Sequence, residues 1–297
     1  MWFLYFLFFG VSFTLIGVGV YQIYVNHQTK IEEQRRIETA RKEEEHRKER
    51  EKREEEERKQ QRKQAMIARN NMLLKKKASF AQLLDSLPKY DISLSDEKHN
   101  RNATLYVECK NMTKSTPINK IKDFVAVDVE TTGLKASGND IIQLSAVKFA
   151  NFEPVELFST YTKPRKNIPK EASDINGITD DMVENAPRFY QIIDSFNKFL
   201  GDLPLIAHNA PFDMKHLYVN GLDSIENKTV YDTLDLSKKI IKGAYSYKLQ
   251  DICEEADIYF NNAHSADVDS LAAGLLFVYL CAERKELTVK DMIDMVK

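Results

Sequence analysis

Hydrophobic residues dominate the first segment of the chain, and charged residues are absent from it. No Lys, Arg, Asp or Glu occurs in the first 29 residues. As a helix rising about 1.5 Å per residue, the apolar run over 2–25 would extend roughly 36 Å, enough to cross a bilayer. Aromatic residues lie near both of its ends, where their rings favour the headgroup region. We therefore expect a transmembrane anchor over residues 1–27.

The orientation of this anchor follows from the charges behind it. Basic residues begin at Lys30 and continue through Arg35 and Arg36, which places the amino end outside and the rest of the chain on the cytoplasmic side. A cleaved signal peptide is the alternative, but it would need a basic start and a small-residue cleavage site. The segment has neither. Three widely spaced cysteines agree with a reducing compartment.

Charged residues of both signs fill the next segment, with 12 acidic and 14 basic side chains over 30–64. Glu repeatedly precedes Lys or Arg by four residues, as in Glu38 and Lys42, and such pairs support a solvated helix. No apolar heptad provides the seam of a coiled coil. We expect a single charged helix over 28–64 that acts as a spacer. Because its charges nearly balance, contact with anionic lipid or nucleic acid is the weaker interpretation.

Apolar residues then return at a spacing of seven: Met66, Leu73, Phe80 and Leu87. This spacing predicts an amphipathic helix that ends at Pro88. The helix either packs on the following domain or pairs with a second copy, and we favour packing. Polar residues dominate beyond it, so the segment 65–119 is expected to consist of this helix and a loop-rich linker.

From residue 120 to 297 the pattern is that of a globular domain. A β-branched run over 124–130 predicts a buried strand, and a short strand is expected over 203–207. Pro211 fits the first turn of a helix that runs to Val219. The apolar run over 271–281 predicts a further helix, which is too short to cross a membrane.

Two carboxylates lie at the end of the first of these strands. Asp128 and Glu130 are two residues apart, so the period of a strand puts them on one face. Because like charges this close repel, a hard divalent cation with oxygen ligands is the natural neighbour. The alternative is a strand end whose acids face water. Asp213 near the start of one helix and Asp269 near the start of another favour the cation.

Three short motifs occur in order along the domain: Asp128-x-Glu130-x-Thr132-Gly133, His208-Asn209-x-x-Phe212-Asp213, and His264 with Asp269 five residues later. Together they resemble the motifs of the DEDDh-type 3′-to-5′ exonucleases, the family that includes the epsilon proofreading subunit of bacterial DNA polymerase III. The resemblance covers about residues 120–285. It includes a segment in which Asn176 stands where the family usually has His, a difference that we expect to leave the active site undisturbed.

The resemblance implies a ribonuclease-H-like α/β fold, with a mixed sheet and helices on both faces. It implies that Asp128, Glu130, Asp213 and Asp269 bind two Mg²⁺ or Mn²⁺ ions, and that His264 takes a proton from the attacking water. It also implies a set of residues near the terminal nucleotide: Thr132, Gly133, Leu134, Asn209 and Phe212. For Phe212 the alternative is a position in the core, which is the commoner one for a phenylalanine.

The net charge of the domain bears on whether it binds nucleic acid, since nucleic-acid-binding proteins usually have a basic surface. Residues 120–297 hold 20 basic and 28 acidic side chains, so we expect metal-dependent contacts with a few terminal nucleotides. One basic patch either contacts the strand or is an ordinary solvated loop: Lys163, Arg165, Lys166 and Lys170. We expect Asp267 to be a solvated acid at a helix start, and His216 to be a surface or packing residue.

The sequence thus predicts a membrane-anchored, metal-dependent 3′-to-5′ exonuclease. Its expected substrate is the 3′ end of single-stranded DNA or RNA, from which it releases nucleoside 5′-monophosphates. The choice between DNA and RNA stays open. The alternative from another class is an inactive nucleic-acid-binding or assembly module held at the membrane, against which stands the presence of all four acids and His264. No Ser occupies a Gly-x-Ser-x-Gly elbow, which argues against a serine hydrolase.

Overall fold

The chain begins with a long helix, α1 (Trp2–Ser86). The computed structural model describes the backbone of residues 2–96 and 118–283, with side chains from Tyr21 onwards. Most of the predicted linker and the last residues of the predicted domain lie outside these ranges. Among the described side chains, no helix is both long enough and apolar enough to cross a membrane. The anchor expected over 1–27 therefore receives no support from this observation.

Ion pairs between residues four apart line the charged part of α1. The N···O distance is 2.9 Å both for Glu38 with Lys42 and for Glu44 with Lys48. All four side chains are exposed, so solvent screens each pair and its contribution to stability is small. The helix predicted over the charged segment is present, and its solvated face is formed by these pairs.

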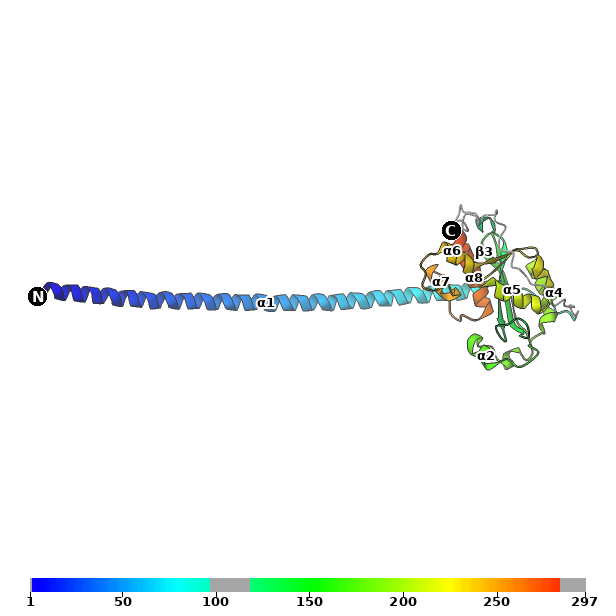
Figure 1. The fold of residues 1–297 in the computed structure, drawn as a ribbon, viewed down its shortest axis with the longest axis horizontal. Coiled ribbons are helices and arrows are strands. Elements are labelled where there is room, and N and C mark those ends of the chain that lie inside the picture. Colours follow the sequence, from blue (N-terminus) through cyan, green and yellow to red (C-terminus); the bar gives the residue numbers. More distant parts are fainter. Residues whose placement is uncertain (1, 97–117, 284–297) are drawn as a thin grey trace. The chain divides into compact units, whose positions relative to one another are not determined.

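Five strands form one mixed sheet in the order β3-β2-β1-β4-β5 (Figure 1). Their bounds are β1 (Phe124–Thr131), β2 (Ile141–Ala150), β3 (Glu153–Tyr161), β4 (Leu205–Ala207) and β5 (Val230–Asp232). The pairs β1–β2 and β2–β3 are antiparallel, whereas β1–β4 and β4–β5 are parallel. The expected mixed sheet is confirmed, with β1 at its centre.

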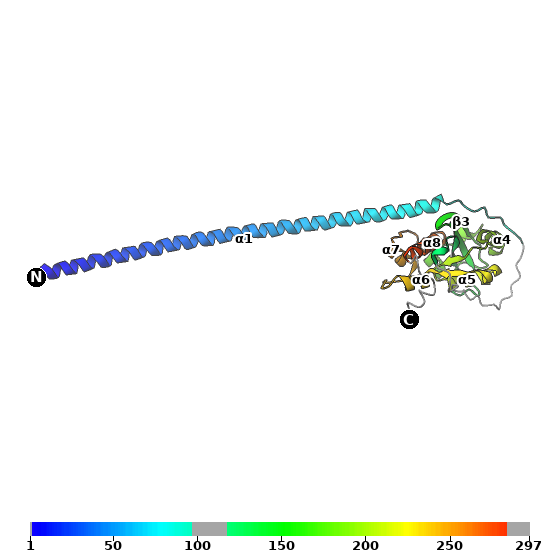
Figure 2. The same ribbon diagram turned by 90° about the horizontal axis from the view of Figure 1, so that it is seen from above.

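Helices cover both faces of this sheet (Figure 2). On one face lie α6 (Thr233–Ile240), α7 (Leu249–Glu255) and α8 (Ala266–Glu283); on the other lie α4 (Phe189–Leu200) and α5 (Ala210–Val219). Alternate residues of β1 face the two cores, with Phe124 and Ala126 towards α8 and Val125 and Val127 towards α5. The predicted helices near 211–219 and 271–281 are therefore present, and the second begins five residues earlier than expected.

Close contact between α8 and the sheet depends on Gly274. A Cβ atom at this position would lie 2.3 Å from Cε2 of Phe149 on β2, so no larger residue fits without displacing the ring. The remaining helical segments are short: α2 (Lys170–Asn176), α3 (Asp180–Val183), and the 3₁₀ turns Ile118–Lys120 and Asp223–Asn227. Residues of α2 and α3 pack on Ile142 in β2 and form a small separate hydrophobic cluster with it.

The last turns of α1 belong to the compact unit that spans 72–297. Phe80 and Leu84 are each 8% exposed, and the Phe80 ring lies 5.3 Å from the ring of Phe260. Beyond the helix, the Tyr90 amide donates to the Leu157 carbonyl at 2.8 Å and continues the edge of β3. The compact unit thus begins well before residue 120, because an apolar stripe of α1 is needed to cover its core.

The expected packing of the amphipathic helix occurs in its second half only. Phe80, Leu84 and Leu87 are buried, whereas Met66 and Leu74 are exposed. Their exposure follows from position, because the contacts with the core involve only the last turns of α1.

Replacing Phe80 by Ala should test this packing. We expect a loss of about 3–5 kcal/mol in the free energy of unfolding, as for other buried aromatic residues cut back to Ala. Urea unfolding of the full chain, followed by near-UV circular dichroism, measures the loss. Met72→Ala, at an exposed position on the same helix, is the matched control and should change stability little. Equal losses in the two variants would mean that α1 does not pack on the domain as described.

Candidate active site

The central strand β1 extends beyond its parallel neighbour and presents two acids there. The register pairs Ala126 with Ile206, and β4 ends one residue later at Ala207, whereas β1 continues to Thr131. Asp128 and Glu130 lie on this extension and are both partly exposed. The register with β2 shifts directly after Glu130, and such an irregularity turns the strand end away from its neighbour. The two carboxylates therefore occupy an open edge.

Asp213 reaches this edge from the first turn of α5. Its side chain is 2% exposed, and its Oδ1 accepts a hydrogen bond from the Val129 amide at 3.2 Å. That amide lies beyond the end of β4, so the carboxylate replaces the hydrogen bond that a longer strand would have supplied. The bond fixes Asp213 next to the two acids of β1.

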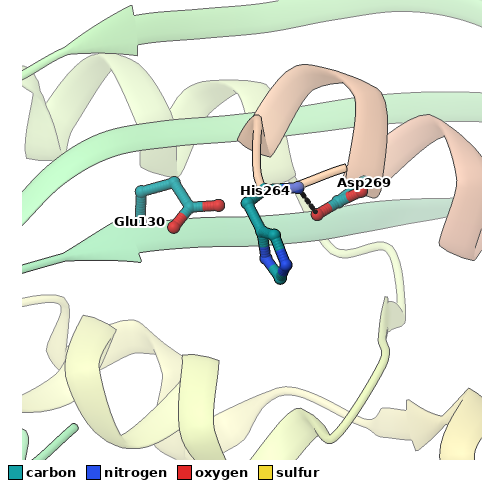
Figure 3. A group of neighbouring side chains, drawn as sticks. All are labelled: Glu130, His264 and Asp269. Carbon is teal, nitrogen blue, oxygen red and sulfur yellow. Dashed lines mark hydrogen bonds between the residues drawn. The ribbon is translucent and has the colours of Figure 1, made fainter. Parts of the chain in front are cut away.

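The third segment brings His264 and Asp269 to the same place (Figure 3). The His264 amide donates to Oδ2 of Asp269 at 3.0 Å, and His264 adopts a left-handed backbone conformation with φ of 70°. Ligand atoms of Glu130, His264 and Asp269 all lie within 4.8 Å of one another. In Figure 3 the Glu130 carboxylate points towards the other two side chains. The three predicted motifs thus converge.

Burial and mutual repulsion raise the pKa of every acid in this cluster. Burial raises the pKa of Asp128 well above its ordinary value, and the charges of Asp213, Asp269 and Glu130 raise it further. Burial also raises the pKa of Asp213, although the Val129 amide opposes the shift. For Glu130, burial and the charge of Asp269 raise the pKa to about 7. For Asp269, burial raises the pKa to about 6 against the effect of the His264 amide. The charge of His264 also lowers the pKa of Asp269, so the acids are balanced only in part within the described residues.

This donor set fits a divalent cation. Oδ1 of Asp269 is buried and has no hydrogen-bond partner within the part of the chain that the structure describes. An orphaned buried oxygen is costly unless a cation or water meets it. Four carboxylates provide the hard oxygen ligands that Mg²⁺ and Mn²⁺ prefer. The cation that the sequence predicted therefore has suitable ligands here.

Two polar residues of β2 support the site, and the sequence reasoning missed them. The Gln143 side chain accepts from the Ala266 amide at 3.1 Å, and the Ser145 hydroxyl lies 3.1 Å from that of Ser270. Both residues are buried, and they pair across the sheet with Glu130 and Asp128 respectively. They attach the start of α8 to β2, the strand that pairs with the acid-bearing β1. The sequence does contain a signal for them, because two polar residues at alternate positions of an apolar strand share one face and indicate polar contacts there.

In the turn after β1, Thr132 has a structural role and Leu134 is exposed. The Thr132 hydroxyl accepts from the Asp140 amide at 2.9 Å and donates to Asn139 at 3.3 Å. A Cβ atom on Gly133 would lie 2.7 Å from Oδ1 of Asn139, so a larger residue would require the Asn139 side chain to move. Leu134 is 84% exposed and is free to meet a ligand.

The second motif begins with a structural histidine. Nε2 of His208 lies 2.9 Å from the Tyr247 carbonyl and Nδ1 lies 3.0 Å from the Thr233 hydroxyl, so the ring is held from both sides. The Asn209 amide donates to Asp232 at 2.9 Å, and Asn209 has a φ of 65°. These bonds fix the turn that starts α5 and hence the position of Asp213.

Phe212 and His216 share one face of α5. Their ring centroids are 4.6 Å apart, and Phe212 is only partly buried in the core beneath. His216 is buried, so it is a packing residue and not a surface one. Phe212 keeps an exposed part that a substrate could contact, although much of its ring packs internally.

Asn176, which stands where the family usually has His, lies beside Glu130. Its side chain hydrogen-bonds Glu130 and lowers the pKa of that carboxyl. Its Oδ1 accepts from the Ile178 amide at 3.0 Å, which leaves the Nδ2 group to donate. The residue lies at the end of α2, which packs on β2 beside the site. Asn176 is therefore a neighbour of the cluster that the motif comparison undervalued.

Two of the four side chains in the basic patch expected near the site pair with acids, and a third donates to a carbonyl. Arg165 Nε binds Asp140 at 2.7 Å, Lys170 forms an ion pair with Asp174 at 2.7 Å, and Lys163 donates to the Glu184 carbonyl at 2.7 Å. These partners favour the solvated-loop interpretation over contact with a strand.

Asp267 lies outside the cluster, as expected. Its carboxylate accepts from the Ser265 hydroxyl at 2.6 Å and from the Val268 amide at 2.9 Å, so it fixes the start of α8.

A change in pH should alter the stability of the metal-free protein through the acidic cluster. Glu130 and Asp269 hold protons in the folded chain up to about pH 7 and 6, whereas their unfolded values are near 4.5 and 3.8. The folded state therefore binds more protons between about pH 4 and pH 7, and stability contributed by these groups is lost as pH rises through that range.

Calorimetry with chelator present measures this effect, compared with the same scan after Mg²⁺ is added. Metal binding requires deprotonated ligands, so Mg²⁺ should raise Tm more at about pH 7.5 than at about pH 5. A rise in Tm that is equal at the two pH values would contradict the assignment of the cluster.

Comparison with known proteins supports the class that this fold and site define. An exonuclease family model, RNase T, matches residues 125–277, more than half of the chain. DNA polymerase III subunit epsilon of Treponema pallidum is 36% identical over 166 residues, which cover 54% of this chain and 76% of that protein. A PolC-type DNA polymerase III of Halalkalibacterium halodurans is 35% identical over 175 residues. The matched region covers 58% of this chain and only 12% of that polymerase.

A solved structure, the nuclease domain of 3′hExo, described as a DEDDh family member bound to rAMP, has 18% sequence identity and a TM-score of 0.47. The alignment covers 56% of this chain and 95% of that domain. The mixed sheet with an acidic cluster at its central strand, together with the match over residues 125–277, defines a nuclease-type α/β domain. The chain belongs to the exonuclease family that this model describes, in agreement with its resemblance to the DEDDh-type exonucleases.

Proposed function

We propose that the protein is a metal-dependent 3′-to-5′ exonuclease that removes 3′-terminal nucleotides from single strands as nucleoside 5′-monophosphates. The observation that supports this most is the convergence of Glu130, Asp269 and His264 beside Asp128 and Asp213. A relative that is 34% identical over 169 residues, DinG of Bacillus subtilis, is described as a 3′-5′ exonuclease. The matched segment covers 18% of that protein, so its other properties are not transferred.

The ligand set of the proposed reaction consists of Asp128, Glu130, Asp213 and Asp269. Two bound Mg²⁺ or Mn²⁺ ions would supply a water of lowered pKa and stabilise the charge on the leaving oxygen. The four carboxylates would hold these ions and, once deprotonated, would balance their charge. The Val129 and His264 amides orient Asp213 and Asp269 through the hydrogen bonds described above.

His264 is the residue suited to proton transfer. It is exposed at the edge of the cluster, so a water that attacks the phosphorus can reach its imidazole. A neutral imidazole accepts a proton near neutral pH and can return it to solvent. Its ring lies beside the carboxylates of Glu130 and Asp269, while its backbone amide holds Asp269. Backbone and side chain thus have separate tasks.

The proposed contacts with the terminal nucleotide involve the exposed edge of Leu134, the partly exposed ring of Phe212 and the turn at Asn209. Apolar surfaces of this kind can stack on a base without reading its identity. Thr132 and Gly133 contribute by shaping the turn that presents Leu134. The T. pallidum relative is a subunit of a DNA polymerase, which makes DNA the first substrate to test.

The test uses the full chain, Mg²⁺ and single strands of DNA and RNA with matched sequence and a 5′ label. The proposal predicts a ladder that shortens from the 3′ end, with nucleoside 5′-monophosphates as products. Comparison of the two rates decides the preference, which depends on how the site treats the 2′-hydroxyl. Cuts at internal bonds, or shortening from the 5′ end, would contradict the proposal. Binding without cleavage would favour the inactive module instead.

Attachment to a membrane is a separate proposal that rests on the apolar sequence of residues 2–25. The basic residues that follow it favour a catalytic domain on the cytoplasmic side. In sealed vesicles oriented as in the cell, external protease should leave the nuclease domain intact. Digestion of the domain from outside would contradict the orientation, and recovery of the chain without membranes would contradict the anchor.

A further inference from the structure

The nuclease domain has an excess of acidic residues, yet a second surface segment, besides the basic patch over 163–170, departs from that balance. Between Asp235 and Asp251 the chain contains no acid. The same stretch contains four lysines: Lys238, Lys239, Lys242 and Lys248. Within the described residues none of them forms an ion pair, in contrast to Lys170 near the other side of the site. We call residues 238–248 the basic loop.

The shape of the basic loop exposes an aromatic ring among these charges. After α6 ends at Ile240, Gly243 takes a φ of 78° and turns the chain. The Tyr247 hydroxyl donates to the Ile241 carbonyl at 2.7 Å, and its ring packs against the core, so the loop is closed on itself. Tyr245 points outward and is fully exposed, and Lys242 and Lys248 on either side of it are exposed too.

The basic loop is joined to the candidate active site by a hydrogen bond. The Tyr247 carbonyl accepts from Nε2 of His208 at 2.9 Å. His208 begins the turn into α5, where Phe212 and Asp213 follow within five residues. The backbone of the loop is therefore attached to the residue that precedes the proposed nucleotide contacts, while Tyr245, Lys242 and Lys248 are exposed to solvent.

We propose that the basic loop binds the single strand just upstream of the terminal nucleotide, with lysines on its phosphates and Tyr245 stacked on a base. A positive surface that alternates with aromatic rings is the usual means of holding a single strand without reading sequence. The bound metal ions would contact only the terminal phosphate. The rest of the domain is acidic, so the remaining phosphates of a single strand need a positive surface elsewhere. This inference rests on the proposed exonuclease function.

The experiment compares two triple variants of the full chain that remove equal charge. One is Lys238→Gln, Lys242→Gln and Lys248→Gln in the basic loop. The other, the control, is Lys163→Gln, Lys166→Gln and Lys170→Gln in the other basic patch, where Lys170 pairs with Asp174 and Lys163 donates to the Glu184 carbonyl. All six positions are exposed, so both variants should fold. Tyr245→Ala is tested separately.

The probe is a labelled oligothymidylate of about 12 nucleotides, within the usual site size of one binding domain. Carbon replaces the bridging oxygen of its last phosphodiester, so that it cannot be hydrolysed. Affinity is measured with Mg²⁺ at several salt concentrations. Cleavage of an ordinary oligonucleotide and of a dinucleotide is measured in parallel.

We expect the loop triple variant to lose roughly tenfold or more in affinity and to flatten the salt dependence by about two units of slope, because each phosphate contact contributes about 0.7. Tyr245→Ala should lose about tenfold with the salt slope unchanged, since stacking involves no charge. Cleavage of the dinucleotide should be unaffected in both. The control variant should match the wild type in every measurement.

Failure of this inference can be told from failure of the proposed function. If the wild type cleaves the oligonucleotide and the loop variants bind like the wild type, the basic loop is not a strand-binding surface and the exonuclease proposal stands. If the wild type binds but does not cleave, and the loop variants bind weakly, the basic loop is a strand-binding surface and the proposed exonuclease activity is wrong. Binding of the basic loop to vesicles of anionic lipid, with no change in oligonucleotide affinity, would also contradict the inference.

Discussion

Replacing Asp213 by Asn is expected to lower the rate of 3′-terminal cleavage by about 1,000-fold or more. Bound metal ions supply several kcal/mol of transition-state stabilisation, and every 1.36 kcal/mol is a factor of ten in rate. Asp213 is the most buried of the four acids at the site, with 2% of its surface exposed. Its loss as a ligand therefore cannot be offset by solvent.

The fold should survive this substitution. The Asn side chain keeps an oxygen that can accept the hydrogen bond from the Val129 amide. Asp267→Asn is the matched control, because Asp267 also lies near the start of a helix but its carboxylate binds the Ser265 hydroxyl and the Val268 amide at the start of α8. Steady-state rates with Mg²⁺ and circular dichroism of both variants provide the measurement. Full activity in folded Asp213→Asn would contradict its role as a ligand.

Replacing His264 by Ala is expected to lower the rate by about 100- to 10,000-fold, the usual effect of losing a general base. The substitution keeps the backbone amide that holds Asp269, so the acidic cluster should persist. Affinity for Mn²⁺, measured by titration calorimetry, should therefore change little. His46→Ala, on the exposed charged part of α1, is the control.

The same experiment distinguishes two roles for His264. Its ring atoms lie within 4.8 Å of ligand atoms of Glu130 and Asp269, so the geometry also admits direct coordination of a cation. If His264→Ala loses Mn²⁺ binding together with activity, the imidazole is a ligand and not the base. Retained metal affinity with lost activity supports the base.

The acids of β1 could be located from the sequence because strand periodicity is a local rule. Asp128 and Glu130 had to share a face of any strand over 124–130, whatever packed around it. The helix-start position of Asp213 suggested a shared cation site, but its contact with β1 could not be predicted, because that contact depends on β4 ending early and leaving the Val129 amide open. Such an edge is a property of the sheet and not of any one segment.

Residues that act across the sheet were beyond the reach of local patterns. Gln143 and Ser145 lie in an apolar strand that the sequence reasoning did not identify, and their partners on α8 are more than 100 residues away. Asn176 was judged by its motif position alone, whereas its role depends on the placement of α2 beside Glu130. The packing of Phe80 was anticipated from heptad spacing, but its partner Phe260 was not.

The most direct test of the account is cleavage of a 5′-labelled single strand by the full chain, first with EDTA and then after excess Mg²⁺ or Mn²⁺ is restored. The account predicts no shortening of the strand with chelator and progressive loss of 3′-terminal nucleotides once either ion returns. Equal degradation in the chelated and the metal-supplied samples would show that the acidic cluster does not act through bound cations, and the central claim would be wrong.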